Sequence, residues 1–155
     1  MTETTQRPAP TATNTETSLR ITRRIHATPE EVFDAWTDAE GMAVWMTPGG
    51  SKHSRVTIDP RVGGKFQIDM VGPNATIEHR GEYLVVDRPR KLSFTWISKP
   101  TNEQRTIVTV ELKPAGANET ELTLTHEGLP SAESTKGHTQ GWGVIVEKLA
   151  ARFER

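Results

Sequence analysis

The chain has 155 residues, no cysteine and a formal net charge of −1 at pH 7, with 19 basic and 20 acidic side chains. This length fits one domain whose hydrophobic core can fold without disulfides or structural metals. The absence of cysteine excludes disulfides, thiolate metal sites and cysteine catalysis, and the balanced charge excludes the basic footprint of a nucleic-acid-binding protein.

The N-terminal segment, residues 1–17, is rich in Thr, Pro and Glu and contains almost nothing that a core would bury. Such a composition is typical of disorder, so we predict a disordered tail over 1–17 and one folded domain over 18–155. The segment lacks the apolar stretch of a secretory signal, and no run approaches the roughly 18 apolar residues of a membrane span. Together with the absence of cysteine, these features predict a cytoplasmic protein without a membrane span.

A first strand is predicted over residues 18–27, and a short helix follows it. Thr28 is suited to cap this helix, Pro29 fits its first position and Glu31 stands at the capping-box spacing. The apolar stripe of the helix consists of Val32, Phe33 and Trp36. After a break at residues 38–41, a second short helix is predicted over 42–46.

From residue 53 to residue 127 the hydrophobic pattern changes to a period of two, which indicates β-strands. Apolar residues alternate with Thr, Ser and charged residues, as is typical of an antiparallel sheet with one face in solvent. Gly81 interrupts one strand and predicts a bulge or bend there. Including the first, the predicted strands cover residues 18–27, 53–59, 65–70, 75–86, 91–98, 105–113 and 120–128.

The last segment, residues 137–155, is predicted to form an amphipathic helix. Its apolar residues recur at helical spacing, namely Trp142, Ile145, Leu149 and Phe153. Gly141 and Gly143 flank the tryptophan although each glycine costs a helix interior about 0.8–1 kcal/mol relative to alanine. One interpretation is that the two glycines leave space open at the end of the helix. The alternative is structural: they allow the helix and the sheet to approach closely, or they belong to a fraying first turn.

The order of strand, two short helices, six strands and a long helix indicates an α+β fold. Seven strands about 4.8 Å apart form a sheet roughly 29 Å wide, whereas a helix with its side chains is only about 10–12 Å across. The sheet must therefore curve around the last helix to cover its apolar face. We expect a concave apolar interior between them, which is the usual form of a small-molecule site.

Five stretches of the chain, in this order and spacing, resemble a known family. Small proteins similar to the C-terminal domain of the activator of heat shock protein 90 ATPase, in the START-like or SRPBCC superfamily, carry similar segments. The resemblance implies a helix-grip fold like that of the birch pollen allergen, with a curved antiparallel sheet of about six to seven strands around a long C-terminal helix and two short helices after the first strand. The stretches are ATPEEVFDAWTDAEGMAVWM, IDPRVGGKF, GEYLVVDRPRKLSFTW, TIVTVELKPAGANETELTLTHEGL and GWGVIVEKLAARF.

The resemblance implies a scaffold rather than one activity, because the superfamily includes lipid carriers, hormone receptors, cyclases and co-chaperones. The matched tryptophans and glycines are architectural positions, and they are Trp36, Trp45, Gly63, Gly64, Gly81, Trp96, Gly141 and Trp142. The eukaryotic activator also has an N-terminal domain with an Asn/Trp/His-rich motif that acts on the chaperone. Nothing in residues 1–17 resembles that motif.

The candidate ligand-binding residues are those that should face the concave interior. They are mostly aromatic, aliphatic and Met side chains, which suit an apolar pocket wall, and Trp45 is expected to close its entrance. Ordinary core packing is the alternative for the aromatic and Met residues among them. The candidates are Trp45, Phe66, Ile68, Met70, Phe94, Trp96, His126, Trp142 and Val146.

No catalytic residue can be assigned from the sequence. The chain lacks the G-x-S-x-G turn of serine hydrolases, and its five histidines form no H-x-H or H-x-x-x-H pair, so we predict no metal and no cofactor. His126 is the one candidate for acid–base chemistry, because the alternation from Leu122 and Leu124 places it on the apolar face. An alternative is a structural histidine bonded to a loop or to water.

Three hypotheses for function follow. The first is a protein that binds a small apolar or amphipathic molecule between the sheet and the last helix. The second, which only the resemblance implies, is a partner of a molecular chaperone that stimulates heat shock protein 90 ATPase. The third is an enzyme of the cyclase or dehydratase kind that uses the same cavity. The chain is expected to be a monomer or a homodimer.

Overall fold

The computed structural model describes residues 11–48 and 53–154, which form one curved antiparallel sheet and three α-helices. The strands are β1 (Thr11–Asn14), β2 (Ser18–Ile25), β3 (His53–Ile58), β4 (Lys65–Val71), β5 (Thr76–Asp87), β6 (Lys91–Ser98), β7 (Thr106–Gly116) and β8 (Glu119–Glu127). The helices are α1 (Pro29–Ala35), α2 (Ala39–Trp45) and α3 (Ala132–Ala151), with a short 3₁₀ turn, η1 (Lys99–Thr101), after β6.

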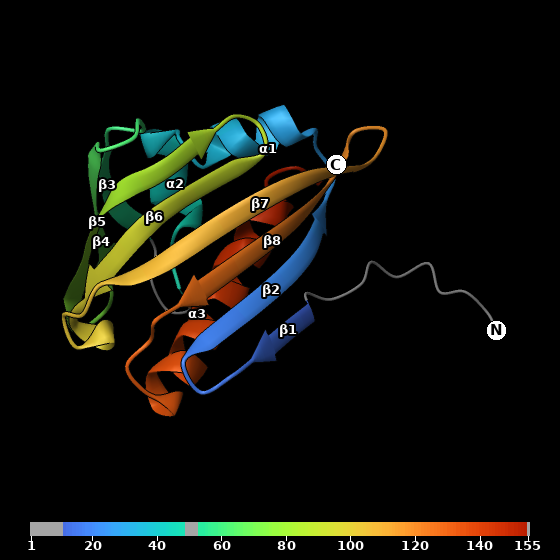
Figure 1. The fold of residues 1–155 in the computed structure, drawn as a ribbon. Coiled ribbons are helices and arrows are strands. Elements are labelled where there is room, and N and C mark those ends of the chain that lie inside the picture. Colours follow the sequence, from blue (N-terminus) through green and yellow to red (C-terminus); the bar gives the residue numbers. More distant parts are fainter. Residues whose placement is uncertain (1–10, 49–52, 155) are drawn as a thin grey trace.

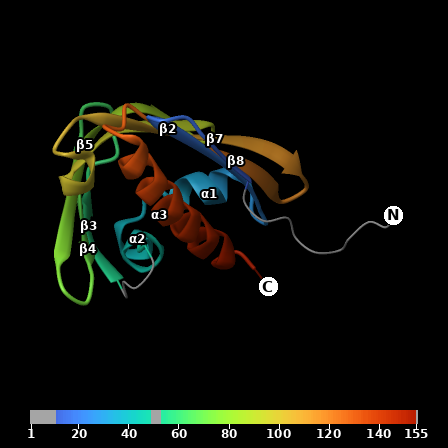
Figure 2. The ribbon, with the colours of Figure 1, turned by 90° about the horizontal axis from the view of Figure 1, so that it is seen from below.

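The sheet has the strand order β1-β2-β8-β7-β6-β5-β4-β3, and every pair is antiparallel. It runs over one side of the molecule while α3 crosses beneath it (Figure 1). Figure 2 shows the sheet bending around α3, with α1 and α2 on the same concave side. The predicted α+β helix-grip architecture is therefore confirmed, with eight strands in place of six or seven.

The disordered tail predicted over residues 1–17 is wrong for Thr11–Asn14, because these residues form β1 and pair with Leu19–Thr22 of β2. The segment buries no side chain, which is why its composition resembles a tail. Pairing with β1 satisfies backbone groups along the outer edge of β2, and threonine is favourable in strands. Residues 1–10 lie outside the described residues.

The helix boundaries also differ from the prediction. α3 begins at Ala132 rather than at residue 137, because the Ser131 hydroxyl accepts a hydrogen bond from the Ser134 amide and caps the first turn. The apolar stripe starts later, so periodicity alone misses this turn. α2 begins at Ala39 and includes part of the predicted break at residues 38–41. At α1 the predicted capping box is present, with the Thr28 and Glu31 side chains bonding each other's backbone amides.

The core is packed tightly where the short helices meet the sheet. The indoles of Trp36 and Trp45 lie edge to face with ring centroids 4.9 Å apart, and Phe66 and Phe94 meet edge to face at 5.4 Å. The void among these side chains is only about 10 Å³, no more than one water requires. This end of the interior is filled by the protein itself.

Polar contacts hold α3 against the sheet and the α2 end. The buried guanidinium of Arg23 on β2 pairs with the Glu147 carboxylate at 2.6 Å. Lys148 donates to the carbonyl and hydroxyl oxygens of Thr47 just after α2. Near the N-terminal end of α3, Thr135 donates to the carbonyl of Glu16. These contacts tie α3 to β2, to Thr47 after α2 and to the connection between β1 and β2.

Gly81 allows two neighbouring strands to pack closely. A Cβ atom at this position would lie 2.0 Å from the Thr95 carbonyl oxygen and 2.7 Å from the Phe66 ring. The irregularity predicted at Gly81 appears slightly later, as a register shift between Tyr83 and Val85 in the pairing of β5 with β6. The glycine therefore serves the close approach, while the adjoining bulge helps β5 to bend.

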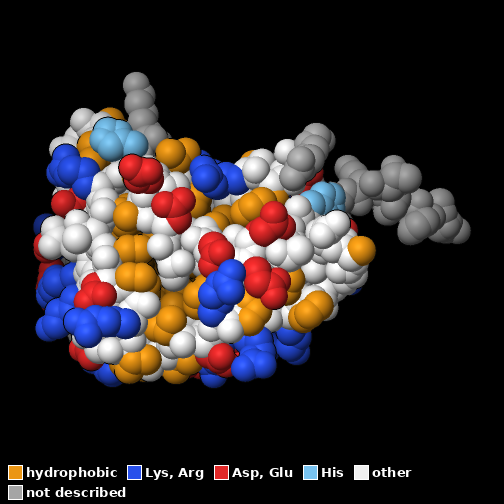
Figure 3. Space-filling view, turned by 90° about the horizontal axis from the view of Figure 1, so that it is seen from above, with side chains coloured by type: hydrophobic (Ala, Val, Ile, Leu, Met, Phe, Trp, Pro, Cys, Tyr) orange, Lys and Arg blue, Asp and Glu red, His pale blue; other side chains and the backbone are white. Residues whose placement is uncertain are grey.

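The outer surface carries acidic and basic side chains side by side on the face shown in Figure 3. This arrangement agrees with the small net charge of the chain. Within residues 11–48 and 53–154, no helix combines the length and the apolar character needed to cross a bilayer.

Candidate functional site

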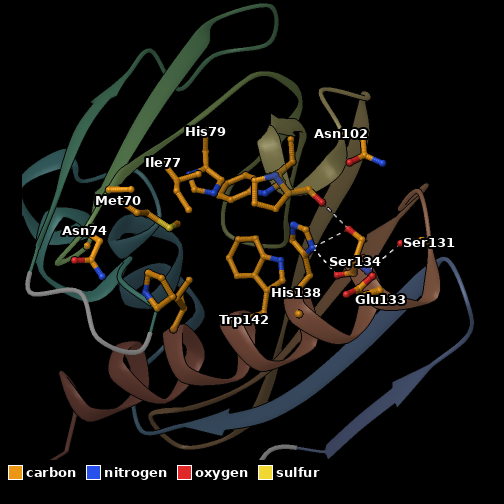
Figure 4. Close-up of a pocket in the computed structure, with 18 of the residues that line it drawn as sticks. Met70, Asn74, Ile77, His79, Asn102, Ser131, Glu133, Ser134, His138 and Trp142 are labelled. Carbon is orange, nitrogen blue, oxygen red and sulfur yellow. Dashed lines mark hydrogen bonds between the residues drawn. The ribbon is translucent and has the colours of Figure 1, made fainter.

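A cleft of about 720 Å³ opens between the first half of α3 and the strands β4, β5 and β6. Figure 4 shows His79, Ile77 and Met70 reaching from the strands toward His138 and Trp142 on α3. The wall is mainly apolar. Its residues are Pro48, Met70, Gly72, Pro73, Asn74, Ala75, Ile77, His79, Trp96, Pro100, Asn102, Ser131, Glu133, Ser134, Gly137, His138, Gly141, Trp142 and Ile145.

Two indoles form the inner wall of this cleft. The rings of Trp96 on β6 and Trp142 on α3 have centroids 5.0 Å apart and planes inclined by 50°. Both side chains are almost completely buried, so each presents only part of its surface to the cleft. Paired indoles with neighbouring aliphatic groups are well suited to contact a flat apolar ligand.

Glycines on α3 leave room for the cleft. A Cβ atom at Gly137 or Gly141 would meet nothing within 4 Å, and both residues line the cleft. This placement agrees with the interpretation that Gly141 leaves space open beside the helix. Gly143 also faces open space, but it borders a separate shallow groove next to Ala12 and Ile21. The two glycines that flank Trp142 therefore lie on different sides of α3.

His126 on β8 is fully buried and belongs to a chain of hydrogen bonds behind the cleft. The Trp142 indole N–H donates to its Nδ1 at 3.0 Å, so this nitrogen carries a lone pair. Its Nε2 lies 2.7 Å from Thr106 Oγ1, which itself lies 2.6 Å from the Trp96 carbonyl oxygen. Because a carbonyl only accepts, Thr106 donates to Trp96, and the Nε2–H of His126 donates to Thr106.

This assignment bears on the role of His126. Both ring nitrogens bind neighbouring protein groups, and His126 does not line the cleft. Protonation of Nδ1 would set its N–H against the indole N–H of Trp142. The arrangement favours a structural histidine over acid–base chemistry, but its partners are Thr106 on β7 and Trp142 on α3 rather than the loop or water that the alternative named. The interior partner that sequence reasoning did not find is Thr106.

His138 occupies the cleft wall one turn before Trp142. Its Nδ1 lies 2.8 Å from the Ser134 carbonyl oxygen and therefore carries the hydrogen. The Ser134 hydroxyl donates to the Pro100 carbonyl at 2.7 Å, which ties this turn of α3 to η1. The ring of His138 meets that of His126 edge to face, with centroids 4.9 Å apart.

His79 faces the cleft from β5. Its Nδ1 lies 3.3 Å from the Ile68 carbonyl oxygen across the β4–β5 pair, and its ring packs on Trp96 with centroids 4.8 Å apart. The side chain is 6 % exposed. His79 and His138 thus present imidazoles from opposite walls, and both are neutral when Nδ1 alone carries a hydrogen.

Burial favours the neutral form of all three histidines. It lowers the pKa of His79 from 6.5 to about 4, although the bond to the Ile68 carbonyl opposes the change. Burial, with the positive charges that His138 and His79 would carry, holds the pKa of His126 well below its usual value. Burial also lowers the pKa of His138, against the opposing bond to the Ser134 carbonyl. No group of three or more potential metal ligands occurs among the described residues.

The structure places the nine sequence-predicted binding residues in two different environments. Met70, Trp96 and Trp142 line the cleft. The other six pack in the buried core or behind the cleft, and they are Trp45, Phe66, Ile68, Phe94, His126 and Val146. Trp45 does not close the entrance, because its indole is 1 % exposed and packs on Trp36.

Sequence reasoning missed the two histidines of the cleft wall. His79 continues the period-two pattern from Ala75 and Ile77, but the irregularity expected at Gly81 left its direction open. His138 precedes Trp142 by four residues and therefore lies on the same helix face. Gly137 and Gly141 have the same spacing, so the pair of i, i+4 repeats was the available signal.

Comparison with known proteins places the geometry in a family. The family model described as "Activator of Hsp90 ATPase homolog 1-like protein" matches residues 26–154. No curated protein matches the sequence significantly.

Solved structures share the fold over most of the chain. An HSP90 activator from Plasmodium falciparum is 28 % identical, with a TM-score of 0.67 over 81 % of this chain and 87 % of that one. A protein from Chromobacterium violaceum is 25 % identical, with a TM-score of 0.78 over 90 % of this chain and 99 % of that one. A protein from Rhodobacter sphaeroides, 20 % identical with a TM-score of 0.78 over 92 % of this chain and 97 % of that one, shares the fold.

Proposed function

This chain belongs to the Activator of Hsp90 ATPase homolog 1-like family, and we propose that it binds a small apolar or amphipathic molecule in the cleft between α3 and β5. The observation that supports this proposal is the convergence of Trp96, Trp142 and the open face of Gly141 on one space of about 720 Å³. Ligand pockets of about 300–1,000 Å³ with apolar walls and a few polar groups are typical of small-molecule sites.

The glycines of α3 support the proposal because they lower the stability of the helix. A helix with alanine at Gly137 and Gly141 would gain about 0.8–1 kcal/mol at each position. Neither substitution meets a steric obstacle, since nothing lies within 4 Å of a Cβ atom at either position. Stability is often lower at positions that serve function, and an open cleft would account for small residues here.

Ligand binding is tested by native mass spectrometry and thermal shift with medium-chain fatty acids and fused-ring aromatics such as 2-methoxynaphthalene. We expect one molecule bound per chain and a concentration-dependent rise of the melting temperature. Gly141→Leu should weaken binding by about tenfold or more because its side chain enters the cleft. Gly143→Leu is the matched control, since it changes the same residue type on the other side of α3. Equal binding by both variants, or no binding by the native chain, would reject the proposal.

A second candidate is a direct partner of a molecular chaperone. It is favoured by the 28 % identity to the HSP90 activator from Plasmodium falciparum over 81 % of this chain. An ATPase assay of purified Hsp90 with added protein tests it. A saturable rise in ATPase rate would support the candidate, and an unchanged rate at excess protein would end it.

A further inference from the structure

Two histidines place imidazole acceptors on opposite walls of the cleft. His138 donates from Nδ1 to the Ser134 carbonyl at 2.8 Å, so the lone pair of the neutral imidazole is on Nε2. The Ser134 hydroxyl cannot reverse this assignment, because its hydrogen is directed to the Pro100 carbonyl. His79 has the same arrangement, with Nδ1 at 3.3 Å from the Ile68 carbonyl.

Within the described residues, no hydrogen bond is formed by Nε2 of either cleft histidine. The third histidine differs, because the lone pair of His126 already accepts from Trp142. The indole N–H of Trp142 is thereby removed from the set of donors that a ligand could use. The inner part of the cleft consequently offers imidazole acceptors beside apolar and aromatic surface (Figure 4). The buried indole N–H of Trp96 is the one donor of the two indoles that has no partner among the described residues.

The charges of the cleft wall are sparse. Among the described lining residues, Glu133 is the only Asp, Glu, Lys or Arg. A ligand carboxylate placed near the imidazoles would face two lone pairs. The described part of the cleft wall contains no Lys or Arg that could pair with it. An uncharged O–H or N–H group would instead satisfy an acceptor, and removal of such a partner from a buried acceptor carries a cost in affinity.

We propose that the cleft selects an uncharged aromatic ligand with a hydrogen-bond donor. Nε2 of His138 accepts the hydrogen bond from this donor, and Nε2 of His79 offers a second acceptor on the facing wall. This inference rests on the proposed ligand-binding function and specifies its chemistry. The aromatic part lies against Trp96 and Trp142, and the donor distinguishes the ligand from a purely apolar one.

Three probes of the same ring system test the donor requirement by isothermal titration calorimetry at neutral pH. 2-Naphthol carries an uncharged donor, 2-methoxynaphthalene lacks it and 2-naphthoate carries a negative charge. We expect 2-naphthol to bind about three- to tenfold more tightly than the methyl ether, and 2-naphthoate to bind most weakly. Equal affinities of naphthol and ether, or tightest binding of naphthoate, would overturn the inference while leaving aromatic binding intact. If none of the three binds, the inference fails, and the proposed function is then decided by the fatty acids of the binding screen.

Two variants locate the acceptor. In His138→Phe the preference for naphthol over the ether should disappear, while the affinity for the ether changes little. His26→Phe is the control, because His26 is exposed and distant from the cleft wall. In the native chain, imidazole ¹⁵N spectra provide a readout that needs no substitution. They should show an unprotonated Nε2 of His138 that shifts on addition of naphthol but not of the ether. A protonated Nε2, or no shift with naphthol, would contradict the assignment.

Discussion

The indole N–H of Trp142 donates to Nδ1 of His126 across 3.0 Å and joins α3 to β8. The chain continues through Thr106 to the backbone carbonyl of Trp96, so one line of hydrogen bonds connects the indole of Trp142 with the main chain of Trp96, the two residues whose indoles form the inner wall of the cleft. A buried polar network of this kind is stabilising when every member has a partner. The position of the aromatic wall therefore depends on a histidine that lies behind it.

Replacement of His126 should chiefly affect stability. His126→Ala leaves the Trp142 indole N–H buried without its acceptor and opens a cavity, so we expect a loss of about 2–4 kcal/mol in the free energy of unfolding. Urea denaturation measures this loss. The exposed His26→Ala should change stability by less than about 0.5 kcal/mol. A His126→Ala protein as stable as the native chain would contradict the network.

Acidification should destabilise the protein below the ordinary histidine pKa. The pKa values of His79, His126 and His138 are all lowered by burial in the folded state. The unfolded chain therefore binds more protons than the folded chain as the pH falls below 6.5, and the free energy of unfolding decreases. Above that pH these groups are neutral in both states and contribute no slope.

The contribution of His79 covers the interval from pH 6.5 to about 4, where its folded-state pKa lies. Over this interval it should remove on the order of 3 kcal/mol of stability. Urea denaturation at several pH values measures the slope, which should decrease in His79→Phe. The same slope in the native chain and in His79→Phe would contradict the assignment of a buried neutral imidazole.

Gly141 and Gly81 should respond in opposite directions to the same substitution. Gly141→Ala adds a methyl group where nothing lies within 4 Å, so the free energy of unfolding should rise by about 0.8–1 kcal/mol. Gly81→Ala drives its methyl group into the Thr95 carbonyl and the Phe66 ring, and should lower that energy by about 1–3 kcal/mol. Thermal and urea denaturation of both variants test the pair, and a destabilised Gly141→Ala would show that α3 packs closely there.

Much of the architecture was predictable because it depends on local patterns. The capping box from Thr28 to Glu31 and the period-two strands are determined by neighbouring residues. β1 was not predictable in the same way, because all four of its side chains are exposed and its order comes from pairing with β2 and from the hydrogen bond of Asn14 to Thr139 on α3.

The site was harder to predict than the fold. A period-two pattern identifies the inward face of a strand, but it does not distinguish a core position from a cleft wall. Phe94 and Trp96 share one face of β6, yet only Trp96 reaches the cleft. That difference arises because α1 and α2 fill one end of the concave face and leave the other end to α3 alone (Figure 2), a tertiary feature that spacing does not encode.

The four indole N–H signals in a ¹H–¹⁵N spectrum, followed during titration with 2-naphthol, test the central claim most directly. Trp96 and Trp142 line the cleft, whereas Trp36 and Trp45 lie in the packed core. We expect saturable shifts that are largest for Trp96 and Trp142 and that are lost in Gly141→Leu. Unchanged signals, or shifts largest for Trp36 and Trp45, would contradict a ligand site between α3 and β5.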